Sequence, residues 1–279
     1  MSLRTLSLTV LAMLAFAGNS LLCRAALRDS QIDPASFTAL RLLAGALVLW
    51  LLLYLRKGAP AASGTWFGAI ALFVYAAAFS YAYLHIDAGA GALVLFGAVQ
   101  VSMIAWGLLR GEQLHRLQVV GLVVAVSGLS ALLLPGTSGP SVSASLVMML
   151  AGVAWGAYSL LGKGASDPLA ATAGNFIRAV PIAAALCLLA FSSLEWDSAG
   201  VTYALLSGGL TSGIGYAIWY AAMPGLAAIQ AASVQLSVPL ITALAGSLLL
   251  GETLTGRLIT AGFAILAGIA LVLRYKRSA

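Results

Sequence analysis

Polar and aromatic residues recur at the spacing of one helix face along several apolar stretches of this 279-residue chain. In chain order they are Phe16, Asn19, Ser20 and Cys23; Tyr75, Phe79 and Tyr83; Phe96, Gln100, Met103 and Trp106; Trp155, Tyr158, Ser159 and Gly162; Ser212, Tyr216, Trp219 and Tyr220; and Gln235 with Thr242. Residues three and four apart share a helix face, and a polar face in an apolar helix turns away from lipid. We expect these faces to meet protein or a cavity, where aromatic rings can stack on the ring of a bound molecule.

The residues expected to contact a small-molecule substrate come from these faces and from one charged position. They are Phe16, Asn19, Ser20, Tyr75, Phe79, Tyr83, Gln100, Trp155, Tyr158, Arg178, Tyr216, Trp219 and Gln235. Asn19 and Tyr158 are favoured most, because they occupy matching positions in two similar segments. The alternative is a general role. Tyr and Trp also form belts at membrane interfaces, and buried Asn or Gln often only bridges two helices, for about 0.6 kcal/mol on average.

Two arginines, Arg41 and Arg178, stand inside apolar stretches. A charge well inside a membrane helix costs about 2.5–3.5 kcal/mol even on insertion scales, so a function is the first hypothesis. Here that function would be capture of a substrate carboxylate. The alternative is that Arg41, near the start of its stretch, extends to the lipid headgroups. Arg178 lies deeper in its own stretch, so we expect it, more than Arg41, to face the interior.

Other reactive residues are few. His85, just before Asp87, could carry protons near neutral pH, but a polar residue at the membrane interface is the favoured interpretation. The chain has two histidines, and none of its acidic residues lies deep in an apolar stretch. An enzyme would need clustered histidines and carboxylates or an activated nucleophile. We therefore expect no enzyme, no metal and no cofactor, and facilitated flux in preference to proton coupling.

Composition sets the class of protein that positions these residues. Hydrophobic residues make up 62% of the chain and charged residues 8%, against about 25% charged in a soluble domain. A soluble fold and a disordered chain are both excluded, and the absence of alternating strands argues against a membrane β-barrel. The net charge of +6 comes from the ends of apolar runs, so nucleic acid is not an expected partner. The chain is predicted to be an all-α polytopic protein in a lipid bilayer.

A helix needs about 20 apolar residues to cross a bilayer. The predicted spans, ten in number, are Leu3–Leu27, Pro34–Leu55, Trp66–Leu84, Ala88–Leu109, Leu117–Leu134, Ser145–Leu161, Pro168–Phe191, Val201–Met223, Leu226–Leu250 and Arg257–Leu273. The first run is taken as a span and not a signal peptide, because its apolar core is too long. Nine Lys and Arg residues on one side against three on the other predict cytoplasmic N- and C-termini.

The two halves of the chain resemble each other. At an offset of about 139 residues the segment from Phe16 to Arg24 overlies that from Trp155 to Lys163, and Gly111-Glu112 overlies Gly251-Glu252. Five spans in each half invert the second half, which is how transporters build a site with alternating access. We therefore expect two inverted five-helix repeats, residues 1–137 and 138–279, around a central cavity. Glu112 and Glu252 are interpreted as structural charges at the start of the helix that follows each.

Two five-span halves that each close their fourth span with Gly-Glu-x-Leu resemble the drug/metabolite transporter superfamily and its EamA-like permeases. Within that group the chain is most similar to YddG-type exporters of aromatic amino acids. The resemblance implies ten helices, a cavity lined by spans one to four and six to nine, and peripheral fifth and tenth spans.

The predicted function is that of a bacterial inner-membrane secondary transporter. It would export small metabolites, with aromatic and other neutral amino acids as the expected substrates, by alternating access and as a monomer. The alternatives are an exporter of cationic drugs or other metabolites, or a channel. A saturable rate far below channel conduction would distinguish a carrier from a channel.

Overall fold

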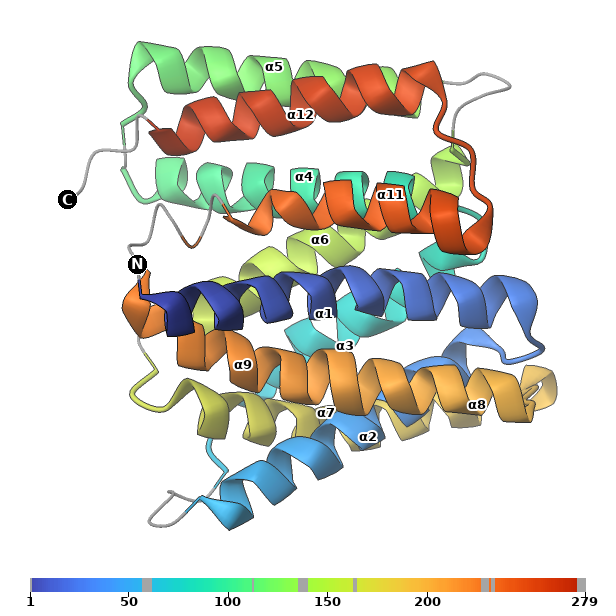
Figure 1. Ribbon diagram of the computed structural model, residues 1–279. Coiled ribbons are helices and arrows are strands. Elements are labelled where there is room, and N and C mark those ends of the chain that lie inside the picture. Colours follow the sequence, from blue (N-terminus) through green and yellow to red (C-terminus); the bar gives the residue numbers. More distant parts are fainter. Residues whose placement is uncertain are drawn as a thin grey trace.

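A computed structural model describes residues 2–56, 62–111, 113–134, 140–162, 165–226, 231 and 234–274, and every regular element among them is helical (Figure 1). The long helices are α1 (Leu3–Asp29), α2 (Pro34–Leu55), α3 (Trp66–Tyr83), α4 (Ala88–Leu109), α5 (Arg116–Leu133), α6 (Val142–Gly162), α7 (Pro168–Leu189), α11 (Ser237–Leu250) and α12 (Gly256–Arg274). A continuous helical segment is formed by α8 (Ser198–Leu205), the π-helix η2 (Leu206–Ile214) and α9 (Gly215–Ala222). Two short 3₁₀ turns are η1 (Phe191–Ser193) and η3 (Met223–Gly225).

In the described part of the chain, eight helices are long and apolar enough to cross a membrane, namely α1 to α7 and α12. They correspond to predicted spans one to seven and ten. The eighth predicted span, Val201–Met223, falls on α8, η2 and α9. The second part of the ninth forms the 14-residue helix α11, and residues 227–230 and 232–233 of that span lie outside the described residues.

Local sequence signals explain where several helices begin. Asp33 accepts hydrogen bonds from the backbone N–H groups of Ala35 (2.8 Å) and Ser36 (3.0 Å), and Pro34 occupies the first helical position of α2. In the second half, Asp167 caps α7 through Ala170 N–H at 3.1 Å, again followed by proline. An acidic cap satisfies N–H groups that have no partner inside the helix, and proline has no N–H to lose there.

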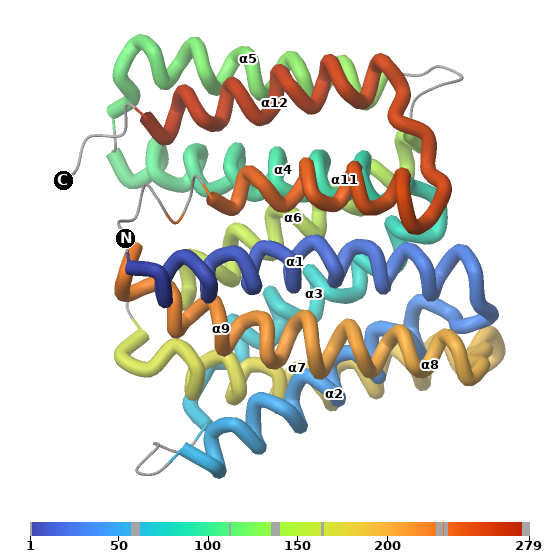
Figure 2. The backbone as a smooth tube through the Cα atoms, viewed as in Figure 1, coloured from blue at the N-terminus to red at the C-terminus, as the bar shows by residue number. Residues whose placement is uncertain are grey.

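The helices pack in layers that place α5 and α12 at one edge of the molecule (Figure 2). These two helices pack against each other, and they reach the rest of the bundle chiefly through α4. Pairs α4–α6, α3–α6, α3–α7 and α2–α7 form the interior, and α1 lies against α9, α11 and η2. The edge position of α5 and α12 agrees with the peripheral place expected for spans five and ten.

Small residues allow the central helices to approach closely. Gly152 of α6 faces the Leu95 carbonyl oxygen and the Ala98 methyl group on α4, which a methyl group on Gly152 would overlap, and Gly156 faces Ser102 one turn further along. Close approach at glycine is the usual device of helix packing in membranes. This pair of glycines is used within the chain, so it gives no indication of a dimer.

An ion-pair cluster with a buried Arg24–Glu252 pair and a half-exposed Asp87 connects α1, α3 and α4 to the loop before α12. The Arg24 guanidinium contacts Glu252 (Nε–Oε1, 3.2 Å) and Asp87 (Nη2–Oδ1, 3.1 Å), and it donates to the carbonyls of Tyr83 (2.8 Å) and Leu84 (3.2 Å). The side chains of Arg24 and Glu252 are only 10% and 6% exposed. The guanidinium therefore supplies hydrogen bonds to the free carbonyl groups at the end of α3, while two carboxylates neutralise its charge.

Glu252 also caps a helix far from it in sequence. Both of its carboxylate oxygens accept from Ala88 N–H, at 2.9 and 3.1 Å, whereas Asp87, at the cap position of α4, makes no capping bond with its side chain. The expectation that Glu252 serves the helix that follows it was wrong, because the carboxylate turns to α4 and not to α12. Burial raises the pKa of the Glu252 carboxyl, and Ala88 N–H and Arg24 oppose that rise. Glu112 lies outside the described residues.

Replacing Glu252 with glutamine should destabilise the fold. The amide can still accept from Ala88 N–H, but Arg24 keeps only Asp87 as a charged partner. Breaking a buried pair costs about 3–5 kcal/mol, and we expect up to about 3 kcal/mol here because Asp87 remains. Thermal unfolding of the purified protein in detergent measures the change. Glu195→Gln, at an exposed carboxylate, is the control, and equal melting temperatures for the two variants would refute the cluster's role.

Candidate functional site

A cavity of about 30 Å³ lies between α1, α3, α4, α6, η2 and α9. Its walls are formed by Phe16, Asn19, Ser20, Tyr75, Phe79, Leu95, Phe96, Trp155, Thr211, Ser212, Tyr216 and Gln235. Space of this size holds about two water molecules, since one needs roughly 10–15 Å³. The cavity is therefore narrow. Residues from both halves of the chain line it, which places it at the centre of the packing.

Eight of the predicted site residues lie in the cavity wall, and they are Phe16, Asn19, Ser20, Tyr75, Phe79, Trp155, Tyr216 and Gln235. Phe96 and Ser212 also line the cavity; they stand on the polar and aromatic faces but were not among the residues expected to contact a substrate. Leu95 and Thr211 had no signal, because an apolar side chain and a lone hydroxyl look the same in a wall as elsewhere in a helix.

The other predicted residues lie outside the cavity wall. Tyr83 is buried beside it, and its hydroxyl donates to the Ala88 carbonyl at 3.3 Å. Tyr158 donates to Thr172 at 3.4 Å, and Trp219 packs edge-on against Phe16 with ring centroids 6.0 Å apart. Gln100 is half-buried on α4.

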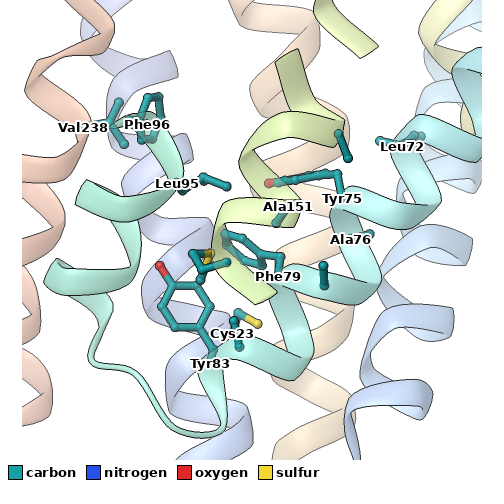
Figure 3. Close-up of a cluster of buried hydrophobic side chains, with 14 of the residues drawn as sticks. Cys23, Leu72, Tyr75, Ala76, Phe79, Tyr83, Leu95, Phe96, Ala151 and Val238 are labelled. Atoms are coloured by element: carbon teal, nitrogen blue, oxygen red, sulfur yellow. The ribbon is translucent and has the colours of Figure 1, made fainter. Parts of the chain in front are cut away.

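Aromatic rings from four helical elements meet at the cavity. Tyr75 of α3 lies 4.8 Å from Trp155 of α6 between ring centroids, and Trp155 lies 5.5 Å from Tyr216 of α9. Phe16 of α1 meets Tyr216 edge-on at 5.8 Å. Figure 3 shows Tyr75, Phe79 and Tyr83 extending from one side of α3 towards α4. Each of these contacts is worth about 0.5–1.5 kcal/mol beyond burial. Together they keep the cavity narrow and make its walls apolar and largely aromatic.

Asn19 is the centre of a buried hydrogen-bond network. Its Oδ1 accepts from Ser207 Oγ (2.7 Å) and Thr211 Oγ1 (3.3 Å), and its Nδ2 donates to the Tyr75 hydroxyl (3.5 Å). The two hydroxyls come from η2, where hydrogen bonds reach five residues back, as is frequent at functional sites. Asn19 thus joins α1, α3 and η2, and its polar side chain forms part of the cavity wall.

Arg41 lies directly behind that wall and is only 2% exposed. Its Nη2 donates to the Tyr75 hydroxyl at 3.2 Å and its Nε to Ser212 Oγ at 3.4 Å. The guanidinium carbon lies 5.3 Å from the ring centroid of Tyr75 and 5.0 Å from that of Phe79, within the range of cation–π attraction. Among the described residues no carboxylate lies within 4.0 Å of it.

The relative depth of the two arginines is the reverse of what we expected. Arg178 is partly exposed, and its Nη1 donates to the backbone carbonyls of Gly174 (2.9 Å) and Ser63. Helical side chains lean towards the helix N-terminus, so Arg178 reaches back one turn to Gly174. Ser63, in the segment before α3, lies beside that turn. Depth along the sequence does not give this direction, and Arg41 is the arginine that reaches the cavity wall.

The histidine and cysteines considered in the sequence analysis or present in apolar helices do not line the cavity. His85 is exposed just after α3, and Cys23 and Cys187 are free thiols, the first fully buried. Within the described ranges, no group of three or more His, Cys, Asp or Glu residues could hold a metal ion.

The close contact between η2 and α2 gives a matched pair of variants. A methyl group on Gly208 would overlap the Arg41 carbonyl, whereas one on neighbouring Gly209 would make ordinary contact, 3.4 Å from Val48. Gly208→Ala should push η2 away from α2 and cost about 1–3 kcal/mol through overpacking. Gly209→Ala should leave the melting temperature unchanged or slightly raised. Thermal unfolding of both variants checks this, and a fully stable Gly208→Ala would contradict the packing.

Three comparisons with known proteins bear on this arrangement. An uncharacterized protein of Pseudomonas aeruginosa is 62% identical over 271 residues, which are 97% of this chain and 94% of the relative. An uncharacterized transporter of Archaeoglobus fulgidus is 24% identical over 285 residues, or 97% of this chain and 98% of the relative. A solved crystal structure shares the fold with a TM-score of 0.68 and 21% identity, covering 95% of this chain and 98% of its own.

The family match covers nearly the whole chain in two parts. Residues 3–134 match the EamA-like transporter family, and residues 142–274 match it again. Each part contributes to the cavity, the first through residues such as Tyr75 and the second through residues such as Trp155. With its apolar helices and this repeated match, the chain belongs to the EamA-like transporter family.

Proposed function

We propose that the protein is an inner-membrane secondary transporter that exports aromatic and other neutral amino acids by alternating access. The observation that carries this proposal is the cavity between the two family-matched segments, with rings such as Tyr75 and Trp155 beside the amide of Asn19. Rings suit an aromatic side chain, and amide and hydroxyl groups suit the polar end of an amino acid.

The proposed architecture has ten spans in two inverted repeats, residues 1–137 and 138–279. Two observations support it. The family matches the chain twice in succession, and α1 begins at the same end of the bundle at which α12 ends (Figure 1). An even number of crossings brings both ends of a chain to the same side, which we propose is the cytoplasm.

Substrate contacts are proposed for the eight predicted residues in the cavity wall. Tyr158 and Trp219 would support them from behind, because Tyr158 packs on Trp155 (5.3 Å between centroids) and Trp219 on Phe16. The cavity is water-sized, so an amino acid can enter only when the rings around it separate. Alternating access supplies that separation, first on one side of the membrane and then on the other.

Uptake into proteoliposomes tests this function. Labelled phenylalanine should enter saturably, threonine more weakly and an organic cation least, with little dependence on an imposed pH gradient, because the described cavity wall has no carboxylate. Trp155→Leu should raise the half-saturation concentration for phenylalanine about 2–10-fold, the equivalent of one lost ring contact.

Trp66→Leu is the matched control, since Trp66 is exposed at the start of α3, more than two helical turns before Tyr75, and is not part of the cavity wall. Melting temperatures show that both variants are folded. If folded wild-type protein carries the cation but neither amino acid, the proposed substrate is wrong. A conduction rate typical of a channel would instead overturn the carrier mechanism.

A further inference from the structure

One guanidinium nitrogen of Arg41 makes no hydrogen bond. Among the buried side-chain nitrogen and oxygen atoms of the described residues, Arg41 Nη1 is the atom without a hydrogen-bond partner. Buried polar groups are normally satisfied, so each exception needs an explanation. We propose that Arg41 binds the carboxylate group of the transported molecule. This inference rests on the proposed transport function and specifies the class of substrate.

The position of the guanidinium fits this role. Its other two nitrogens hold Tyr75 and Ser212, and both of these side chains line the cavity. The rings of Tyr75 and Phe79 lie within cation–π range and restrict the group's orientation. The guanidinium is therefore held directly behind the wall before any ligand arrives, with one nitrogen still able to donate when the rings in front of it separate.

The charge balance points to an anion. No carboxylate of the described residues pairs with Arg41. Arg178 and Arg257 also have no acidic partner there, but both are partly exposed, whereas Arg41 is only 2% exposed. An arginine isolated from water needs a compensating negative group. The unpaired Nη1 can donate charge-assisted hydrogen bonds to a carboxylate, and the hydroxyls of Tyr75 and Ser212 lie beside the guanidinium to complete the binding site.

The substrate class follows from the same surroundings. The rings at the cavity suit an aromatic group, and Arg41 suits a carboxylate, so the cargo is an aromatic carboxylate with or without an amino group. An aromatic amine that lacks the carboxylate would bring a second positive charge towards Arg41. The described lining contains no acidic residue to offset that charge.

Three ligands of similar shape test the inference on the wild-type protein. Phenylalanine has both charged groups, 3-phenylpropionate lacks the amino group, and phenethylamine lacks the carboxylate. Binding to the full-length protein in detergent is followed by quenching of tryptophan fluorescence, because Trp155 lies in the wall, and by the rise in melting temperature on binding. Phenylpropionate should bind at least about tenfold more tightly than phenethylamine, as expected for loss of a charged hydrogen bond.

Two arginine variants locate the effect. Arg41→Gln should abolish the preference for the carboxylate, and Arg178→Gln should keep it, because the Arg178 guanidinium bonds to backbone carbonyls away from the wall. Tyr75→Phe keeps the ring and removes one hydroxyl that orients Arg41, so it should reduce the preference without removing it. Because the ligand series on the wild type needs no variant, a poorly folded Arg41→Gln does not weaken the test.

The outcomes separate this inference from the proposed function. Equal binding of phenylpropionate and phenethylamine, or a preference that survives in Arg41→Gln, overturns the carboxylate site, while amino-acid uptake would still support the transporter. Binding of phenylpropionate without phenylalanine supports the site and refutes amino acids as the cargo. Failure of both carboxylates to bind at millimolar concentration also overturns the inference.

Discussion

Every polar group buried in this apolar bundle must find a partner inside it, and the arrangement of the central helices follows from that constraint. Helix α1 meets it twice. Its Arg24 binds groups at the end of α3, the start of α4 and the loop before α12. Its Asn19 hydrogen-bonds to Tyr75 and to two hydroxyls of η2. The cavity lies where the second of these networks meets the aromatic rings, so the same contacts that hold the helices together also form its walls.

Helix faces in the sequence identified several residues of the cavity wall, but not every residue on such a face lies in it. Phe16, Asn19 and Tyr75 line the cavity as expected, because a polar or aromatic face in an apolar helix has to turn from lipid. Tyr158 and Trp219 satisfied the same rule and lie behind the wall. Spacing identifies the face that leaves lipid, but it does not say whether that face meets a cavity or another side chain.

What the sequence could not predict depends on contacts between distant parts of the chain. Glu252 caps a helix that begins 164 residues earlier, and no local pattern links the two positions. Arg41 and Arg178 differ in the direction of their side chains, which is decided by the neighbouring helices and not by depth in an apolar run. Other helix starts have local signals, and so the Asp-Pro caps at Asp33 and Asp167 were readable as breaks between spans.

The π-helix η2 also sets the rotational phase of everything that follows it. A residue added to or removed from an α-helix turns the subsequent face by about 100°. Tyr216 is the second residue after η2 and reaches the cavity in the phase that the wider turns impose. A π-turn holds one residue more than an α-turn, so closing η2 into regular α-helix at its present length would rotate Tyr216 and Trp219 together out of register with α1. The wider turns of this segment therefore determine which side of α9 faces α1 and the cavity.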